Sequence, residues 1–347
     1  MYTIIDSTLP IIYPETMNNT KKELSSQAQA AKAIRKELKE AFPPATNQHG
    51  ESVWPVARLM IASELSTGCV LFPEIDPMYG QNNSSEPAQA ERVIDRMPIE
   101  ALVLADSNFG IFRLAYHCQL RRKEFLFRLT ASRFKALTRQ GTLVEEDPSH
   151  RTWHVIWSPS AKELKNNPHL TKDAQVEVFL HEIKLEDGTH LYLVTNVEAD
   201  AASLGALYLR RYDVEFDIRD IKVTLDTENI RARKLDTVMK ELHGSIIAYN
   251  LVAQFRRQAA QLASVPPRRL SFSGVWLTFR HHLLYAPPQS FEQWRETYVA
   301  ALISAANRKL PNRTRPRSYP RIAHTRRPKS TKFQKSLRTK NNKEPPD

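Results

Sequence analysis

The sequence contains only two cysteines, Cys69 and Cys118, among its 347 residues. Two thiols this far apart cannot build a disulfide framework or a thiolate zinc site, and their scarcity is typical of a reducing cytoplasm. The first ten residues have neither a basic segment nor a long apolar segment, so they do not form a secretory signal. No uninterrupted apolar run approaches the roughly 18 residues that suggest a membrane span. We therefore expect a cytoplasmic protein without membrane partners.

Several common catalytic sequence patterns are also missing. The chain has no G-x-x-x-x-G-K-[ST] loop and no G-x-G-x-x-G loop, which excludes ATP-binding and dinucleotide-binding sites of those kinds. It has no G-x-S-x-G nucleophile elbow either. The eleven histidines are scattered, and neither His117 nor the His281–His282 pair has other ligand residues at metal-binding spacing. For these histidines we expect core or surface roles.

Acidic residues are absent from one long segment near the C-terminus. Between Arg308 and Lys343 there are fourteen Lys or Arg and no Asp or Glu. This segment accounts for the whole formal charge of +12, because the preceding residues carry equal numbers of bases and acids. A neutral body with a basic extension is typical of an arm that binds a polyanion in a salt-dependent way. The alternative is a solvated tail without a specific partner.

The hydrophobic periodicity predicts an α/β chain of about two domains. Apolar runs bounded by turn residues predict strands, with an Asp187–Gly188 hairpin turn between the last two; these strands span residues 2–5, 53–65, 69–75, 101–105, 124–129, 152–157, 176–185 and 190–197. Amphipathic segments predict helices over residues 27–42, 86–97, 112–122, 204–225, 235–263 and 291–308. Pro, Ser and Thr among the bases of residues 309–347 predict a tail without packed structure.

Two acids follow predicted strands directly. Asp6 closes the first run, and Asp106 closes the apolar run 101–105, whose continuous hydrophobicity predicts a strand buried on both faces. Ligand-binding and catalytic groups in open α/β sheets gather at strand ends. Asp is also a common turn residue and helix cap, and for each acid taken alone this structural role is favoured.

A third acid lies on the predicted helix 204–225. At about 100° per residue, Tyr208, Arg211, Glu215 and Lys222 fall on one narrow stripe. Next to it lies an apolar stripe, formed by Leu207, Val214, Ile218, Ile221 and Leu225. An ordinary amphipathic helix with an Arg211–Glu215 ion pair explains the same pattern.

These four residues satisfy Y-x2-R-x3-E-x6-K, which resembles the signature around the third acid of bacterial insertion-sequence transposases of the IS-four type. Other segments resemble that family in the same order along the chain. They are IIDST with PET (4–16), WPVARL (54–59), LADSNF (104–109), MKELHGSIIAYNLV (239–252), and NRTRPRSYP with RRPK (312–320 and 326–329). The resemblance therefore covers nearly the whole chain.

The resemblance implies an RNase H-like (retroviral-integrase-like) α/β core with a β-rich insertion, a helical C-terminal region and a disordered basic tail. The expected division is a core of residues 1–140 and 201–263, an insertion of 141–200, a helical region of 264–308 and a tail of 309–347. The implied activity is DNA transposition: metal-dependent cleavage at transposon ends, followed by transfer of the 3′-hydroxyl into target DNA. Double-stranded DNA and a second copy of the chain in a homodimer are the implied partners, at the bacterial nucleoid.

The resemblance also implies site residues. Asp6, Asp106 and Glu215 would hold two Mg²⁺ ions, for which Mn²⁺ could substitute, since hard cations prefer carboxylate oxygens. Residues on the third-acid helix and in the tail would contact DNA; they are Tyr208, Arg211, Lys222, Arg313, Arg315, Arg326, Arg327 and Lys329. An extruded base would need an aromatic acceptor, for which Trp153, Trp157 and Tyr192 are candidates, although we expect them to pack in the core.

Two departures from the family pattern leave alternatives open. Ser107 and Asn108 follow Asp106, where the family more often has Arg-Gly. Met1 lies only five residues before Asp6, where family members usually carry a domain that binds transposon ends. One alternative is therefore a truncated, inactive DNA-binding remnant. Another is an RNase H-fold nuclease that cleaves structured nucleic acid without strand transfer.

Overall fold

The computed structural model describes residues 2–10, 36–48, 50–227, 230–232, 234–285 and 290–311. Its strands are β1 (Tyr2–Pro10), β2 (Pro44–Asn47), β3 (Gly50–Glu64), β4 (Val70–Pro77), β5 (Leu102–Ala105), β6 (Glu124–Arg128), β7 (Thr142–Asp147), β8 (His150–Trp157), β9 (Val176–Lys184) and β10 (His190–Thr195). Its α-helices are α2 (Glu86–Arg96), α3 (Phe112–Leu120), α4 (Ala131–Thr138), α5 (Ala161–Asn166), α6 (Ala201–Leu209), α7 (Asp213–Arg219), α8 (Leu235–Leu262), α9 (Phe272–Tyr285) and α10 (Phe291–Ala306). Short 3₁₀ and π segments complete the described elements: η1 (Arg210–Tyr212), η2 (Asp220–Thr224) and η3 (Pro267–Arg269). The predicted mixed α/β architecture with a helical C-terminal region is confirmed.

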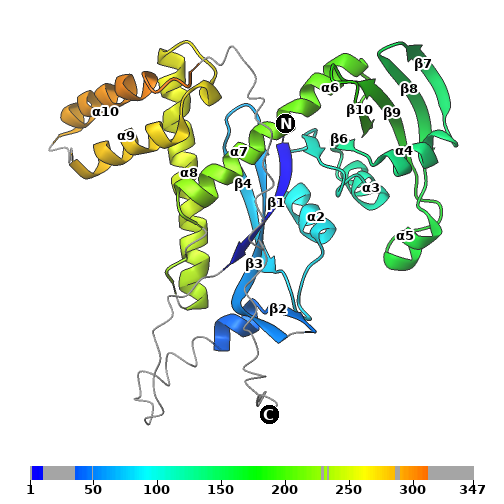
Figure 1. Ribbon diagram of the computed structural model, residues 1–347, viewed down its shortest axis with the longest axis horizontal. Coiled ribbons are helices and arrows are strands. Elements are labelled where there is room, and N and C mark those ends of the chain that lie inside the picture. Colours follow the sequence, from blue (N-terminus) through cyan, green and yellow to red (C-terminus); the bar gives the residue numbers. More distant parts are fainter. Residues whose placement is uncertain are drawn as a thin grey trace, which may run out of the picture.

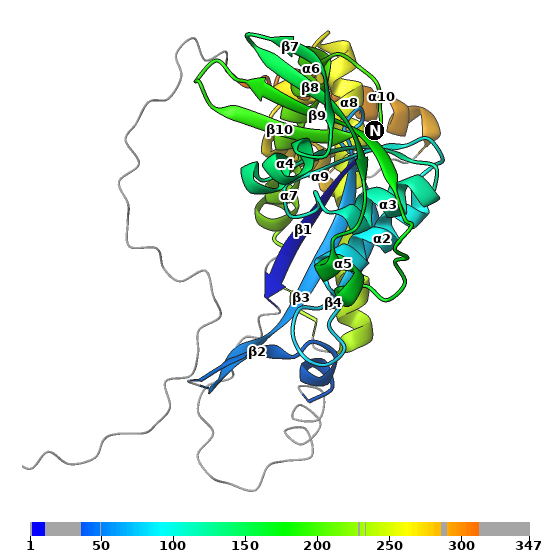
Figure 2. The same cartoon turned by 90° about the vertical axis from the view of Figure 1, so that its right-hand side faces the viewer.

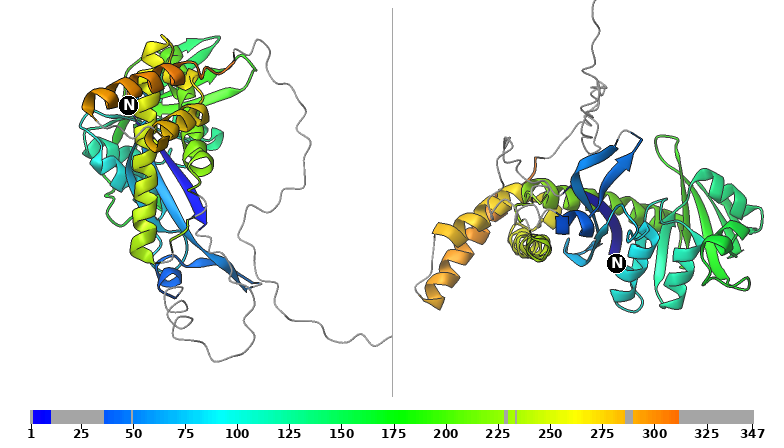
Figure 3. Two further views of the ribbon diagram at one scale, coloured as in Figure 1. Left: turned by 90° about the vertical axis from the view of Figure 1, so that its left-hand side faces the viewer. Right: turned by 90° about the horizontal axis from the view of Figure 1, so that it is seen from below.

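The described strands form one ten-stranded sheet, in the order β2-β3-β1-β5-β6-β10-β9-β8-β7, with β4 paired to β3 (Figure 1). β1 runs antiparallel to β3 and parallel to β5, and β5 runs parallel to β6. The strands of residues 141–200 continue this sheet, because β10 pairs antiparallel with β6. The molecule is consequently elongated, with β7 and β8 at one end and α9 and α10 at the other (Figure 3).

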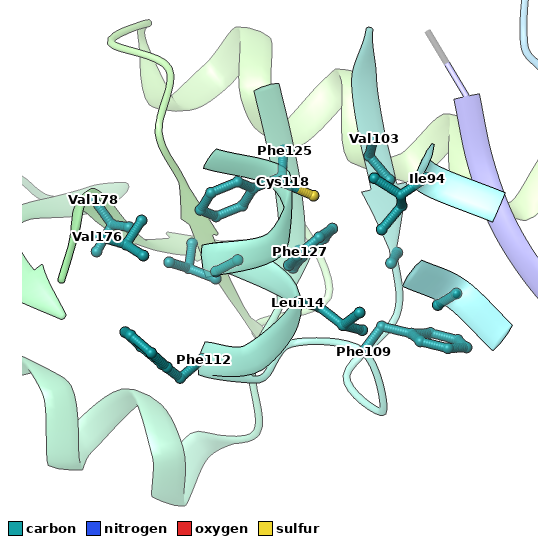
Figure 4. Packing of buried hydrophobic residues seen from close by; sticks show 14 of the residues in the cluster. Ile94, Val103, Phe109, Phe112, Leu114, Cys118, Phe125, Phe127, Val176 and Val178 are labelled. Carbon is teal, nitrogen blue, oxygen red and sulfur yellow. The ribbon is translucent and has the colours of Figure 1, made fainter. Parts of the chain in front are cut away.

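The central strands are buried on both faces, as predicted for residues 101–105. Val103 belongs to a core cluster with residues of α2 and α3, whereas its neighbour Leu104 belongs to a cluster with residues of α6 and α7. Figure 2 shows α2 and α3 on one side of the strands and α7 on the other. The α3 side is filled largely by aromatic and branched side chains, among them Phe112, Phe125 and Phe127 (Figure 4).

The C-terminal helices form a second packed unit on one face of β3 and β4. α8 contacts β4, and α9 and α10 both contact α8. Leu59 and Ile61 of β3 point into this cluster, together with Tyr249, Val252 and Phe255 of α8. The helix predicted over 235–263 is thus confirmed. None of the helices in the described ranges is long and apolar enough to cross a membrane.

Three expectations need correction or fall outside the described residues. The first strand does not end at Asp6: β1 continues to Pro10, since residues 5–10 pair with residues 56–61 of β3. The expected tail does not begin at Lys309, which forms a β-bridge with Leu270. Most of the predicted helix 27–42 is not described, apart from helical residues 36–41.

The predicted helix 204–225 also differs from a uniform α-helix. Its path is divided into α6, the 3₁₀ turn η1, α7 and the π-helical η2. A 3₁₀ turn advances more, and a π turn less, than the 100° per residue of an α-helix. The single stripe predicted from Tyr208 to Lys222 therefore holds only within α7 and the turn before it.

Candidate active site

Asp106 lies directly after β5, at the carboxyl edge of the central sheet. Its side chain is half-buried, and Oδ1 accepts a hydrogen bond of 2.8 Å from the Asn108 backbone N–H. The following loop is fixed by Arg133, which donates to the carbonyl oxygens of Ser107 and Gly110 at 3.2 and 2.6 Å. Among the described residues Oδ2 of Asp106 has no hydrogen-bond partner, so this oxygen is available for a ligand.

Arg211 connects the third-acid helix electrostatically to Asp106. Its Nη2 donates to Glu215 Oε1 at 3.1 Å, and its guanidinium carbon lies 4.7 Å from the ring centroid of Tyr212. Burial lowers the pKa of Arg211, but Tyr208, Glu215 and Asp106 outweigh this effect and raise it. The charges of two predicted acids, far apart in the sequence, thus act on the same guanidinium group.

Tyr208 is inside the protein and does not lie on an exposed stripe. Only 1% of its surface is exposed, and it packs with Leu104, Leu126 and Leu193. Its hydroxyl is buried without a hydrogen-bond partner among the described residues. Burial raises the pKa of Tyr208 to about 12. The expectation that its ring packs on a nucleotide is therefore wrong, because the core already covers that ring; a hydrogen bond from the hydroxyl to DNA stays a prediction.

Arg128 is a functional candidate that the sequence analysis missed. It ends β6, and because Ala105 pairs with Phe127 in parallel register, Arg128 and Asp106 follow neighbouring strands at the same edge. Its charge, like that of Arg211, opposes the rise that burial causes in the pKa of Tyr208. The sequence did contain a signal for Arg128. The predicted strand run EFLFR ends in a basic residue, just as the strand run ALVLA is followed directly by the acidic residue Asp106.

Glu215 is on the solvent side of α7, with 59% of its side chain exposed. α7 contacts β1, the strand that carries Asp6 opposite Met60. The backbone therefore brings the elements of all three predicted acids together, although the Asp6 side chain is not among those described. Lys222 lies in the π-helical η2 and is half-buried. The tail residues Arg313, Arg315, Arg326, Arg327 and Lys329 lie outside the described residues.

No three His, Cys, Asp or Glu side chains among those described form a group that could hold a metal ion. The predicted triad is not tested by this result, since the Asp6 side chain is not described. Asp106 and Glu215 both offer carboxylate oxygens, which are the donors that hard divalent cations prefer. The chemistry of these two side chains therefore fits the expected metal.

The aromatic residues of the insertion pack in the core, as expected. Trp157 is buried, and Trp153 makes an edge contact with Phe134 at 5.4 Å between ring centroids. Tyr192 packs on Phe134 at 4.7 Å. Within the described geometry, these three rings are occupied by protein contacts.

Comparison with known proteins gives the class of the chain. Residues 16–251 match the family described as "Transposase DDE domain", and the chain belongs to this family of DDE transposases. The matched range contains Asp106 and Glu215 but begins after Asp6. This result and the next support the IS-four type that the Y-x2-R-x3-E-x6-K signature predicted.

One curated relative is "Transposase InsG for insertion sequence element IS4" of Escherichia coli (strain K12), which is 26% identical over 303 residues. The aligned region covers 82% of this chain and 63% of the relative, so the chain matches less than two thirds of that protein's length. A similar solved structure is the "Cryo-EM structure of piggyBac transposase synaptic complex with hairpin DNA (SNHP)". It has 9% identity and a TM-score of 0.41, and the match covers 90% of this chain and 57% of that chain.

Proposed function

We propose that this chain cleaves DNA phosphodiesters at transposon ends and transfers the resulting 3′-hydroxyl into target DNA. The family membership supports the reaction class, and the strands β4, β3, β1, β5 and β6, with the helices on both faces, support an RNase H-like core for residues 1–140 and 201–263. The observation that carries the proposal is the position of Arg211, which donates to Glu215 Oε1 at 3.1 Å and interacts electrostatically with Asp106. This position supports a shared site for two acids from distant segments.

In this proposal Asp6, Asp106 and Glu215 hold two divalent cations, Mg²⁺ or Mn²⁺. Bound there, the ions would supply activation of the attacking oxygen and stabilisation of the leaving oxygen. Arg211 offsets the repulsion between clustered carboxylates and offers guanidinium N–H groups to a DNA phosphate. Arg128 adds a second positive charge at the same sheet edge.

The proposed partner is double-stranded DNA, as terminal inverted repeats and as target. The body of the chain is electrically neutral, so the basic residues after Asn307 supply the general attraction to the DNA backbone. Lys222 and the tail bases Arg313, Arg315, Arg326, Arg327 and Lys329 are proposed phosphate contacts. Two copies of the chain would act together on a pair of ends.

The test is a cleavage and joining assay on a duplex that carries the terminal repeats flanking the gene. We expect Asp106→Asn and Glu215→Gln to lose nicking in both Mg²⁺ and Mn²⁺, while their salt-sensitive DNA binding remains. Glu198→Gln is the matched control, because Glu198 is exposed in the loop after β10. Full nicking by either site variant would refute the assignment.

The same assay separates the alternatives. DNA binding by the unmodified chain without any metal-dependent nicking would identify an inactive DNA-binding remnant. Nicking without joined products would identify a nuclease that lacks strand transfer.

A further inference from the structure

A second charged region lies beside α7 and is separate from the proposed active site. It is a hollow of about 320 Å³ between the β3–β4 turn, the start of α7, α8 and η3. Three arginines line it, Arg210, Arg256 and Arg268, together with one carboxylate, that of Asp213. Asp213 precedes Glu215 by two residues, which is roughly 200° around an α-helix. The hollow therefore faces the side of α7 away from Glu215.

Arg256 is the unusual member of this group. Only 3% of its surface is exposed, yet its Nε and Nη2 have no hydrogen-bond partner among the described residues. Its guanidinium carbon lies 5.2 Å from the ring centroid of Phe272, a cation–π contact that provides no hydrogen-bond acceptor for these N–H groups. Buried charged groups are normally paired, because an unpaired one is costly. The free N–H groups of Arg256 therefore call for an acceptor.

Arg256 lines the hollow, and its Nη2 lies beside the β3–β4 turn. Gly68, in the β3–β4 turn, has a positive φ of 72°, and a Cβ at this position would lie 3.4 Å from Arg256 Nη2 and 3.9 Å from Arg268 Nη2. The backbone thus approaches both guanidinium groups closely. Arg210 Nη2 and Arg268 Nη1 donate to the same acceptor, the Leu65 carbonyl, at 3.1 and 3.3 Å. Three guanidinium groups converge on one turn.

Three carboxylates, those of Asp213, Asp217 and Asp220, lie near these arginines, but only Asp213 belongs to the lining. Asp217 Oδ2 accepts from Arg268 Nη2 at 2.5 Å and from the Ser63 hydroxyl at 2.9 Å. Asp213 Oδ2 lies 3.7 Å from Arg268 Nη1 and 3.9 Å from Arg210 Nε, which are loose contacts. Asp220 also faces Arg256 electrostatically, but no hydrogen bond joins them within the described residues. The lining itself carries three positive groups and one negative group.

We propose that this arginine hollow is a phosphate-binding site, in which Arg256 supplies the central guanidinium fork and Arg210 and Arg268 flank it. Guanidinium N–H groups match the oxygens of a phosphate in charge and geometry. The Ser66 side chain adds a hydroxyl group to the lining, whereas the Thr67 hydroxyl already donates to Glu64 Oε2 at 2.5 Å. The site goes beyond the proposed function, because it uses none of the proposed metal ligands and does not depend on cleavage activity.

The first experiment is calorimetric titration of the full chain with inorganic phosphate, against chloride at matched ionic strength. We expect saturable binding at one site, with at least about tenfold weaker affinity in Arg256→Gln, since charge-assisted hydrogen bonds are lost. Arg257→Gln is the matched control, being the adjacent residue on α8 but not part of the lining. Asp106→Asn should bind phosphate normally, so this result is independent of the cleavage assay.

A second variant covers the case in which Arg256→Gln fails to fold. Ser66 is exposed at the rim, so Ser66→Glu adds a competing carboxylate without disturbing a buried group. It should also weaken phosphate binding. No saturable binding by the unmodified chain, or equal affinity in a folded Arg256→Gln or Ser66→Glu variant, would overturn the proposal.

The source of the phosphate is resolved by a duplex of arbitrary sequence. If the hollow holds a DNA backbone phosphate, both variants weaken duplex binding and inorganic phosphate competes with the duplex. If it holds a free phosphate group, both variants lose phosphate affinity and duplex binding is unchanged. Either result supports the site, whereas phosphate binding that persists in both variants contradicts it.

Discussion

Asp220 is a half-buried carboxyl group on η2, whose Oδ1 accepts a hydrogen bond of 3.4 Å from the Thr224 hydroxyl. Burial raises the pKa of Asp220 to about 6; the charge of Arg256 opposes this rise, whereas that of Asp217 adds to it. In the unfolded chain an Asp titrates near 3.8. Between these two values the folded protein retains a proton that the unfolded chain has released. The free energy of unfolding must therefore fall as pH rises through this window.

Asp220→Asn removes this titration. We expect the variant to be less pH-dependent than the unmodified protein between pH 4 and pH 7, and to gain on the order of 1–3 kcal/mol relative to it over that range. The measurement is chemical unfolding at several pH values, with Asp236→Asn as the control, since Asp236 is exposed at the start of α8. Parallel stability–pH curves for the two proteins would rule out a raised pKa at Asp220.

At the residue scale, sequence motifs predicted Asp106, Arg211 and Glu215 as site residues, and these assignments stay predictions. In the structure Arg211 donates to Glu215 Oε1 at 3.1 Å and interacts electrostatically with Asp106. Arg128 and Arg256 belong to no pattern of this kind. Their importance arises from neighbours that the fold supplies, and a single sequence does not reveal those contacts.

At the element scale, apolar periodicity predicted most helices and strands to within a few residues. The division of residues 201–224 into α, 3₁₀ and π segments was not predicted. These segments differ only in whether an N–H bonds to the third, fourth or fifth preceding carbonyl, and similar residues suit all three. Which of the three helix types forms depends on how the buried side chains of Tyr208, Val214 and Ile221 pack in the core. Local sequence does not determine this tertiary packing.

The loop between β5 and α3 is the element that positions Asp106, and it depends on Gly110. A Cβ at Gly110 would lie 2.1 Å from the Arg128 carbonyl oxygen, a backbone atom that cannot move independently. We expect Gly110→Ala to cost on the order of 1–3 kcal/mol of stability and to reduce cleavage by displacing the loop. Thermal unfolding and the nicking assay measure the two effects.

Gly244→Ala is the matched control for this prediction. Gly244 lies within α8, and no atom would lie within 4 Å of an added Cβ. The same chemical change should therefore stabilise the protein by about 0.5–1 kcal/mol, because alanine restricts the unfolded chain and favours the helix. Equal effects of the two substitutions would show that the loop tolerates a side chain at Gly110.

At the scale of the whole molecule, the β-rich segment 141–200 was predicted as an insertion, but its position was not. The structure shows it as an extension of the central sheet through the β6–β10 pair. Pairing of β10 with β6 joins residues more than sixty positions apart, and local periodicity contains no information about such partners. Because of this strand order, the insertion lies at one end of the molecule and the C-terminal helices lie at the other (Figure 3).

Charge is distributed just as unevenly over the molecule, and the basic tail should dominate general attraction to DNA. Replacing Arg326, Arg327 and Lys329 with Gln removes up to three phosphate contacts. We expect binding to any duplex to weaken, and the slope of log affinity against log salt to become shallower by up to about 3.

The matched control replaces Lys162, Lys165 and Lys172, which are exposed on or near α5 and carry the same total charge. If the tail acts as an arm, only the tail variant changes the slope. Equal slopes in all three proteins would indicate a solvated tail without DNA contacts, and equal losses in both variants would indicate an effect of net charge alone.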